Sequence, residues 1–161
     1  MVKYYTIIEV MMKIFSYNCI RLLTIGLFII YILYLVYLTL FAYNYGRGNI
    51  NRSLNIIPFK TIVYFLSANL SYKIKIINII GNIAAFVPMG VLLPIIKNNI
   101  GIKKIVIIGL IGTVSIEVIQ YITGVGASDV DDVILNILGT VFGYLIYCLS
   151  NRGVSILLDN Q

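Results

Sequence analysis

Long apolar runs without charge alternate along the chain with short polar segments. From Leu22 to Tyr43 no residue is charged, and these 22 residues exceed the roughly 20 that a helix needs to cross a bilayer. Three further apolar runs follow at 76–96, which should be kinked by its two prolines, at 105–122 and at 133–150. This pattern predicts an all-α integral membrane protein with four transmembrane helices, at about 22–43, 76–96, 105–122 and 130–150.

The longest connection lies between the first two predicted spans. Its first part, 44–53, is rich in Gly and Asn and is typical of a loop. The segment at about 56–70 is apolar but contains Lys60, and its uncharged part from Thr61 to Leu70 is too short to span. It is predicted to form an interfacial or re-entrant helix. A single membrane domain is thus expected at 21–152, between a cytoplasmic N-terminal segment, 1–20, and a cytoplasmic tail, 153–161.

The composition supports the bilayer as the solvent of this chain. Apolar residues make up 60% of it and charged residues only 11%, against about 25% charged residues in an ordinary soluble domain. The net charge of +6 does not indicate a nucleic-acid partner, because the basic residues stand singly at the edges of apolar runs. Cys19 and Cys148 form no C-x-x-C pair, and the chain has no histidine, so neither a metal nor a cofactor is expected.

Basic residues predict the orientation. Four spans put both termini on one side, together with seven basic residues: Lys3, Lys13, Arg21, Lys97, Lys103, Lys104 and Arg152. The opposite side has five: Arg47, Arg52, Lys60, Lys73 and Lys75. Because cytoplasmic segments carry the excess of Lys and Arg, both termini are expected in the cytoplasm.

The polar residues of the last three spans are expected to converge at the outer side. Asn78 and Asn82 lie near the outer start of the second span, Glu117 and Gln120 near the outer end of the third, and Asp129, Asp132 and Asn136 at the start of the fourth. Their spacings of three, four and seven residues put each set on one helix face. Gly139 and Gly143 continue the face of the fourth span as a G-x-x-x-G, which favours contact with another helix.

Structural and functional interpretations compete for these residues. Ser128 as N-cap with Asp131 resembles a capping box, so Asp131 is expected to serve its own helix; Asp129 can cap that helix and also face the others. The asparagines and Gln120 can be simple hydrogen-bonding glue between helices. Glu117 is the strongest functional candidate, because a carboxylate within a span is costly and normally pairs or marks a functional pathway. Burial favours its protonated form and a partner such as Arg47 or Arg52 its ionised form.

Four segments in order resemble the VanZ-like family of bacterial membrane proteins. "NIIPF" at 55–59 is similar to its N-L/I-I-P-F element, and "SIEVIQ" at 115–120 to its S-x-x-E-x-x-Q motif. "NIIGNIAAFVPMGVLLP" at 78–94 and "SDVDDVILNILGTVFGY" at 128–144 resemble two longer segments of the family. Many members carry an Arg shortly before the first Asp, whereas "TGVGAS" here has none, so a paired outer cation would have to be Arg47 or Arg52.

The resemblance implies a multi-pass protein of the bacterial cytoplasmic membrane that can lower susceptibility to glycopeptides, since the family name comes from a member associated with teicoplanin resistance. It implies no established reaction. A non-catalytic protein would bind the headgroup of a membrane lipid or lipid-linked cell-wall intermediate through Asn78, Asn82, Glu117, Gln120, Asp129, Asp132, Asn136, Arg47 and Arg52.

Two other interpretations stay open. An intramembrane enzyme would use Glu117 and Asp132 as an acid/base pair, or as ligands of a hard divalent cation, on a lipid-linked substrate. A proton or ion conduit would need a homo-oligomer, because one chain with four spans is too small to enclose a pore.

Overall fold

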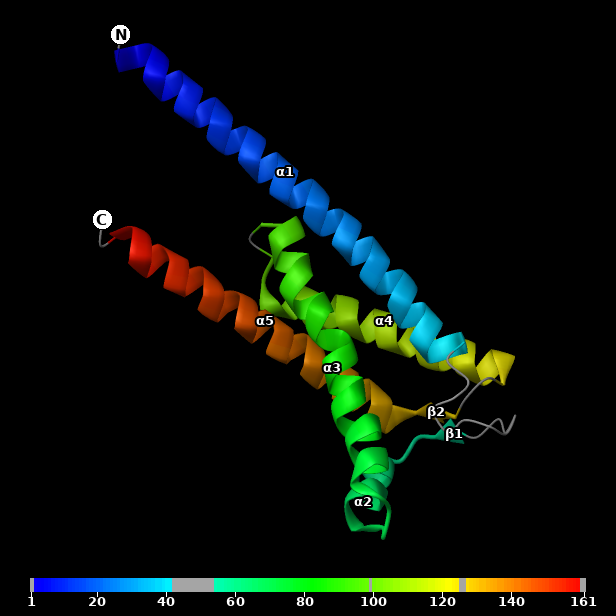
Figure 1. The fold of residues 1–161 in the computed structure, drawn as a ribbon. Helices are drawn as coiled ribbons and strands as arrows, with labels where there is room; N and C mark the ends of the chain where they lie inside the picture. The colour runs from blue at the N-terminus through cyan, green and yellow to red at the C-terminus, as the bar shows by residue number, and fades with distance from the viewer. Residues whose placement is uncertain (1, 42–53, 99, 125–126, 160–161) are drawn as a thin grey trace.

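The computed structural model describes residues 2–41, 54–98, 100–124 and 127–159, which form helices and one small pair of strands (Figure 1). The helices are α1 (Val2–Val36), which continues as the π-helix η1 (Tyr37–Phe41), α2 (Lys60–Ser67), α3 (Tyr72–Ile96), α4 (Ile102–Thr123) and α5 (Val130–Asp159). The strands are β1 (Leu54–Asn55) and β2 (Ser128–Asp129).

Four helices of the described chain are long and apolar enough to cross a membrane, which confirms the predicted fold class. These candidate spans are Phe15–Leu40, Tyr72–Ile96, Ile102–Thr123 and Val130–Asn151. The segment predicted to be interfacial or re-entrant at about 56–70 contains α2, whose eight residues are too few to span.

The first and last helices are longer than predicted. Helix α1 begins at Val2, well before Leu22, where the first span was predicted to begin. No Gly or Pro lies within residues 2–20 to end a helix, so α1 continues through the segment that we expected to be separate. Likewise α5 continues through most of the predicted tail, as far as Asp159. The division into a membrane domain and two cytoplasmic ends stays a prediction.

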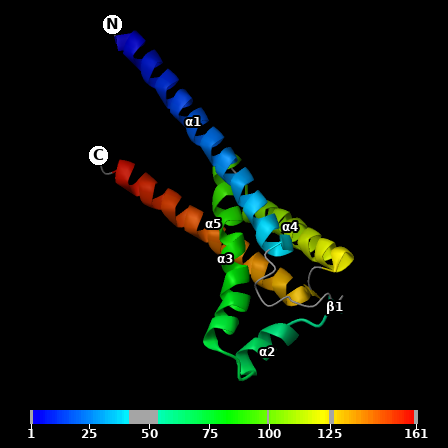
Figure 2. The same ribbon diagram turned by 45° about the vertical axis from the view of Figure 1, so that its right-hand side comes forward.

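The two ends of the chain lie at the same end of the molecule (Figures 1 and 2). The C-terminal ends of α1 and α4 and the N-terminal end of α5 lie at the opposite end, beside the strand pair. An even number of spans predicts this arrangement. It brings the segments that carry the candidate residues into one region.

Helices α3 and α5 form the most extensive helix contact of the described chain, and they cross where both carry glycine. A Cβ atom at Gly139 would collide with the carbonyl oxygen of Ile83, and one at Gly143 with that of Val87. A Cβ at Gly90, on α3, would collide with the backbone of Thr140 and Tyr144. The G-x-x-x-G face of α5 therefore packs inside the bundle, as its spacing predicted, and the two backbones touch without side chains between them.

Helix α1 is attached to this crossing through a small apolar core. Leu35 of α1 packs against Phe86 and Met89 of α3, and all three side chains are buried. The hydroxyl of Tyr31 donates a 2.9 Å hydrogen bond to the carbonyl oxygen of Ala85. Pro88 has no N–H group, so the carbonyl oxygen just before that of Ala85 lacks its helical hydrogen bond. Tyr31 of α1 therefore adds a hydrogen bond next to the place where α3 is missing one. Helix α3 nevertheless continues through Pro88 and Pro94.

The glycine crossing predicts a contrast between two neighbouring positions of α5. Gly139→Leu should greatly reduce the amount of folded, monodisperse protein, because its side chain has to displace the backbone at Ile83. Leu138→Phe should be tolerated, because Leu138 is 43% exposed on another face. Fluorescence-detected size-exclusion chromatography and thermal unfolding in detergent measure both variants. Equal behaviour of the two would contradict the observed crossing.

Candidate functional site

A parallel pair of two-residue strands joins the middle of the chain to the start of α5. Leu54 of β1 is opposite Ser128 of β2, and Asn55 is opposite Asp129. Strands this short have little stability of their own. The pairing depends on the side-chain hydrogen bonds that surround it, and its consequence is to hold α2 beside the N-terminal end of α5.

The segment Asn55–Lys60 makes a tight turn into α2. The side-chain oxygen of Asn55 accepts a 3.2 Å hydrogen bond from the backbone N–H of Ile57, and the N–H of Lys60 reaches the carbonyl of Ile57 at 3.4 Å. Phe59 has φ 65° and ψ −1°, the values of the third residue of a type II turn, and Pro58 stands at the second position, which Pro favours. A phenylalanine with positive φ is strained, so the surroundings must hold it in place.

Asp131 supplies that restraint. One carboxylate oxygen accepts from the N–H of Phe59, and the other accepts from the N–H of Thr61 at 2.7 Å and of Ile62 at 3.0 Å. These amides include donors of the first turn of α2, which has no side-chain cap of its own. The carboxylate, with 0% of its residue exposed, therefore caps a helix about 70 residues away in sequence and lies at the positive end of its dipole.

The carboxylate of Asp129 completes the same junction. It accepts from the Asn55 amide at 2.8 Å, from the Thr61 hydroxyl at 2.5 Å and from the backbone N–H of Asp131 at 2.9 Å. The last bond caps the first turn of α5. Asp129 thus ties together β1, α2 and α5, and we call Asn55, Phe59, Thr61, Asp129 and Asp131 the clamp.

The predicted capping box of Ser128 and Asp131 is wrong. Ser128 lies in β2, and Asp129 instead provides the side-chain cap of α5. The carboxylate of Asp131 is thereby released from its own helix and serves α2. Charge-assisted bonds to three backbone donors outweigh one reciprocal bond within α5, which is the physical reason for the difference.

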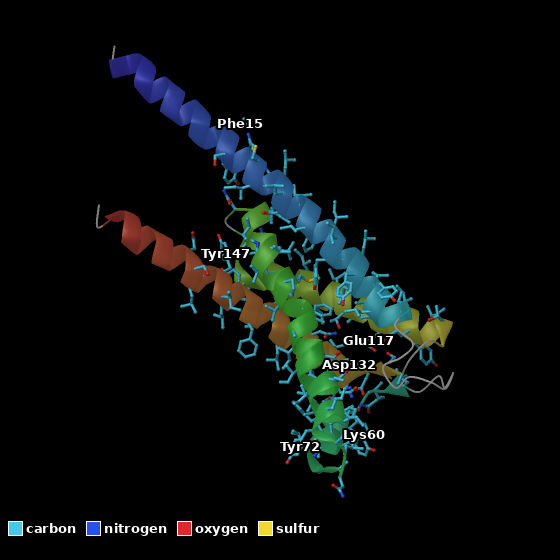
Figure 3. All side chains as sticks on the ribbon, in the orientation of Figure 1. Phe15, Lys60, Tyr72, Glu117, Asp132 and Tyr147 are labelled. Atoms are coloured by element: carbon cyan, nitrogen blue, oxygen red, sulfur yellow. The ribbon has the colours of Figure 1, made fainter. Side chains whose placement is uncertain are left out.

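The other two carboxylates lie next to the clamp. Glu117 accepts a 2.8 Å hydrogen bond from the backbone N–H of Asp129, so α4 is linked to the start of α5. Asp132 accepts from the side-chain amide of Asn82, which links α5 to α3. Figure 3 shows Glu117 and Asp132 between the end of the molecule with Phe15 and Tyr147 and the end with Lys60 and Tyr72. Each of the four carboxylates from the α4–α5 region therefore has a donor from another segment.

Two amide side chains on the same faces are almost fully buried. Gln120, 1% exposed, donates to the carbonyl oxygen of Thr39 in η1 at 2.8 Å. Asn136, 5% exposed, donates to the hydroxyl of Thr113 on α4 at 2.7 Å. Both amides form hydrogen bonds between helices, which agrees with their interpretation as hydrogen-bonding glue: they connect α4 to η1 and to α5.

The oxygens of both amides, Gln120 Oε1 and Asn136 Oδ1, are buried and have no hydrogen-bond partner in the described structure. An unpaired buried acceptor costs roughly 1–3 kcal/mol. Proteins normally avoid this cost by supplying a donor, a water or a ligand. These two oxygens are the unsatisfied positions of the site.

The remaining candidates lie apart from these contacts or outside the described residues. Asn78 donates to the carbonyl oxygen of Ile74 in its own helix, at 2.8 Å. Lys60 is exposed. Arg47 and Arg52 fall within 42–53 and are not described. In the described part of the chain, no group of three or more Cys, Asp and Glu side chains is arranged to hold a metal ion.

Sequence reasoning missed Asn55, Thr61 and Thr39 as partners of the site. "NIIPF" drew attention as a motif, but no spacing rule shows that its Asn and the following Thr meet an aspartate more than 65 residues later. We call the polar side chains at this junction the polar cluster: Asn82, Thr113, Glu117, Gln120, Asp129, Asp131, Asp132 and Asn136.

Comparison with known proteins agrees with the motifs. The model of the VanZ/LLP1 family matches residues 28–151, which include all four motif segments. A protein VanZ of Enterococcus faecium is 32% identical over 136 residues, which are 82% of this chain and 78% of that protein. No solved structure matches the chain. With its four apolar helices and this match over most of its length, the chain belongs to the VanZ/LLP1 family of membrane proteins.

Proposed function

We propose that this chain binds the headgroup of a membrane lipid or a lipid-linked cell-wall intermediate at the polar cluster, and that it thereby lowers susceptibility to glycopeptides such as teicoplanin. Membership of the VanZ/LLP1 family supports the association with resistance. The binding itself is argued from the site.

The observation that carries this proposal is that the clamp holds an exposed apolar segment beside the polar cluster. Six apolar side chains of the α2 segment are more than half exposed: Ile56, Ile57, Phe59, Val63, Tyr64 and Leu66. Such a surface is stable against acyl chains and costly against water. Because Asp131 holds this segment beside the polar cluster, an amphiphile can place its headgroup at the cluster and its chains along α2.

The same site supports an outer-leaflet location. Helix α2, the strand pair and the start of α5 lie at the end of the molecule opposite the termini (Figure 1), and Glu117 and Asp129 are hydrogen-bonded there. With seven of the twelve basic residues on the side of the termini, the positive-inside rule puts the termini in the cytoplasm and the cluster toward the outer leaflet. Cell-wall intermediates and glycopeptides meet at that outer surface.

Cysteine labelling tests this orientation. In a chain carrying Cys19→Ala and Cys148→Ala, Ser71→Cys should react with a membrane-impermeant maleimide in intact cells. Asn98→Cys should react only after the membrane is permeabilised. Both positions are exposed, so their difference reports sidedness rather than burial. The reverse pattern would put the polar cluster at the inner leaflet.

The role of the carboxylates is tested in a strain in which the wild-type chain reduces teicoplanin susceptibility. At equal membrane abundance, Glu117→Gln and Asp132→Asn should lose most of the effect, since a hydrogen bond to a charged group is worth about 1.5–3 kcal/mol, or ten- to a hundredfold in affinity. Ser115→Ala is the matched control, because its hydroxyl is exposed and bonds within α4.

Mass spectrometry of the extracted envelope lipids separates binding from catalysis in the same cells. Unchanged lipid species alongside a lost resistance phenotype support binding. A lipid species that appears or disappears with the carboxylates would overturn binding in favour of an intramembrane enzyme using Glu117 and Asp132. Full resistance in both variants would show that these carboxylates are not needed for the effect.

A further inference from the structure

Two facing rows of polar side chains connect the clamp to the interior of the helix bundle. On α4, Thr113, Glu117 and Gln120 are spaced by four and three residues, and all three are buried. On α5, Asp132, Asn136 and Thr140 are spaced by four residues. The hydrogen bond from Asn136 to Thr113 joins the two rows one turn from Glu117. The unsatisfied oxygens of Gln120 and Asn136 therefore belong to rows that flank Glu117.

Turning the amides does not remove the deficit. A turned Gln120 would put its oxygen against the carbonyl oxygen of Thr39, where two acceptors repel each other. A turned Asn136 could accept from the hydroxyl of Thr113, but its nitrogen would then lose its only described acceptor. At Gln120 the missing hydrogen-bond donor therefore does not depend on the amide orientation. At Asn136 either orientation leaves one buried polar atom of the amide without a partner among the described residues.

The basic residues whose side chains the structure describes do not supply these donors. Arg21, Lys60, Lys73, Lys97, Lys103 and Lys104 are exposed, and the half-buried Lys75 donates to the carbonyl oxygen of Leu66 at the end of α2. Oxygens of four carboxylates and two amides also make the surroundings repulsive to a phosphate. A species that fits this environment carries positive charge and several N–H donors.

We propose that the polar cluster takes the protonated primary amine of a headgroup, with Gln120 Oε1 and Asn136 Oδ1 accepting its N–H groups beside Glu117. This inference rests on the proposed headgroup binding and specifies its chemistry. A primary ammonium has three donors and one charge, which suits two neutral oxygens next to a carboxylate. It is also small, and both oxygens are closed to solvent, which favours it over a bulky sugar.

The sharpest probe is a pair of lipids that differ in N–H donors alone. Phosphatidylethanolamine has a primary ammonium; phosphatidylcholine has the same charge but three methyl groups in place of the donors. The full-length chain in detergent is mixed with equal amounts of these lipids and phosphatidylglycerol, all with the same acyl chains. Native mass spectrometry then measures which lipids are retained.

The wild-type chain should retain phosphatidylethanolamine about tenfold over phosphatidylcholine, the size of one charge-assisted hydrogen bond. Gln120→Met and Asn136→Leu each remove one amide, with its unsatisfied acceptor and its donor, and should reduce this ratio severalfold. Ser115→Ala should leave the ratio unchanged. Thermal unfolding shows which variants are folded. The preference of the wild-type chain for phosphatidylethanolamine over phosphatidylcholine is a test that does not depend on any variant.

Other outcomes separate this inference from the proposed function. Equal retention of phosphatidylethanolamine and phosphatidylcholine would overturn the amine inference, and so would a preference that survives both amide variants. If phosphatidylglycerol is then retained in a way that Glu117→Gln or Asp132→Asn abolishes, headgroup binding at the cluster still holds. Retention of none of these lipids would count against both. A free small amine such as ethanolamine, added as competitor, should displace the lipid only if the amine itself is the recognised group.

Discussion

The carboxylate of Asp131 accepts hydrogen bonds from the backbone N–H groups of Phe59, Thr61 and Ile62, and the arrangement of α2 beside the start of α5 depends on this contact. Near a membrane, unpaired backbone donors at the start of a helix are costly because little water is available to satisfy them. The carboxylate of Asp131 satisfies these donors. The same hydrogen bonds offset the free-energy cost of burying the carboxylate. It also holds Phe59 in a strained left-handed conformation that turns the chain into α2.

The clamp and the glycine crossing support each other. Contact between the backbones of α3 and α5 at Gly90, Gly139 and Gly143 fixes where α5 begins, and so where Asp129, Asp131 and Asp132 can reach. Asn82 on α3 then meets Asp132, and Glu117 on α4 meets the backbone of Asp129. In the proposed function this frame holds an exposed apolar helix for the acyl chains of an amphiphile next to buried, acceptor-rich polar rows for its headgroup.

Periodicity and composition were enough to predict the fold, because 20-residue apolar runs and single-face spacing follow directly from helix geometry. The same reasoning predicted that Asn82, Glu117, Asp129, Asp132 and Asn136 come from facing rows at one end. It failed at Asp131, which was assigned to its own helix, since no local rule shows that a turn 70 residues earlier lacks a cap. It expected hydrogen bonds between helices from Gln120 and Asn136 but did not identify their partners, Thr39 and Thr113. These partners depend on the axial position of each helix relative to its neighbour. The helical period of 3.6 residues does not determine that position.

Hydrogen exchange of the backbone amides in 57–66 tests the clamp most directly. The measurement compares the wild-type chain, Asp131→Ala and Asp132→Asn in lipid nanodiscs, with mass spectrometry as the readout. Asp132 is the matched control, because its carboxylate bonds Asn82 rather than α2. Asp131→Ala should speed exchange in 57–66 about ten- to a hundredfold, as expected for lost bonds to a charged acceptor, while peptides from the α3–α5 crossing stay protected and Asp132→Asn leaves 57–66 unchanged. Wild-type protection of 57–66 in Asp131→Ala would contradict the central role of this carboxylate.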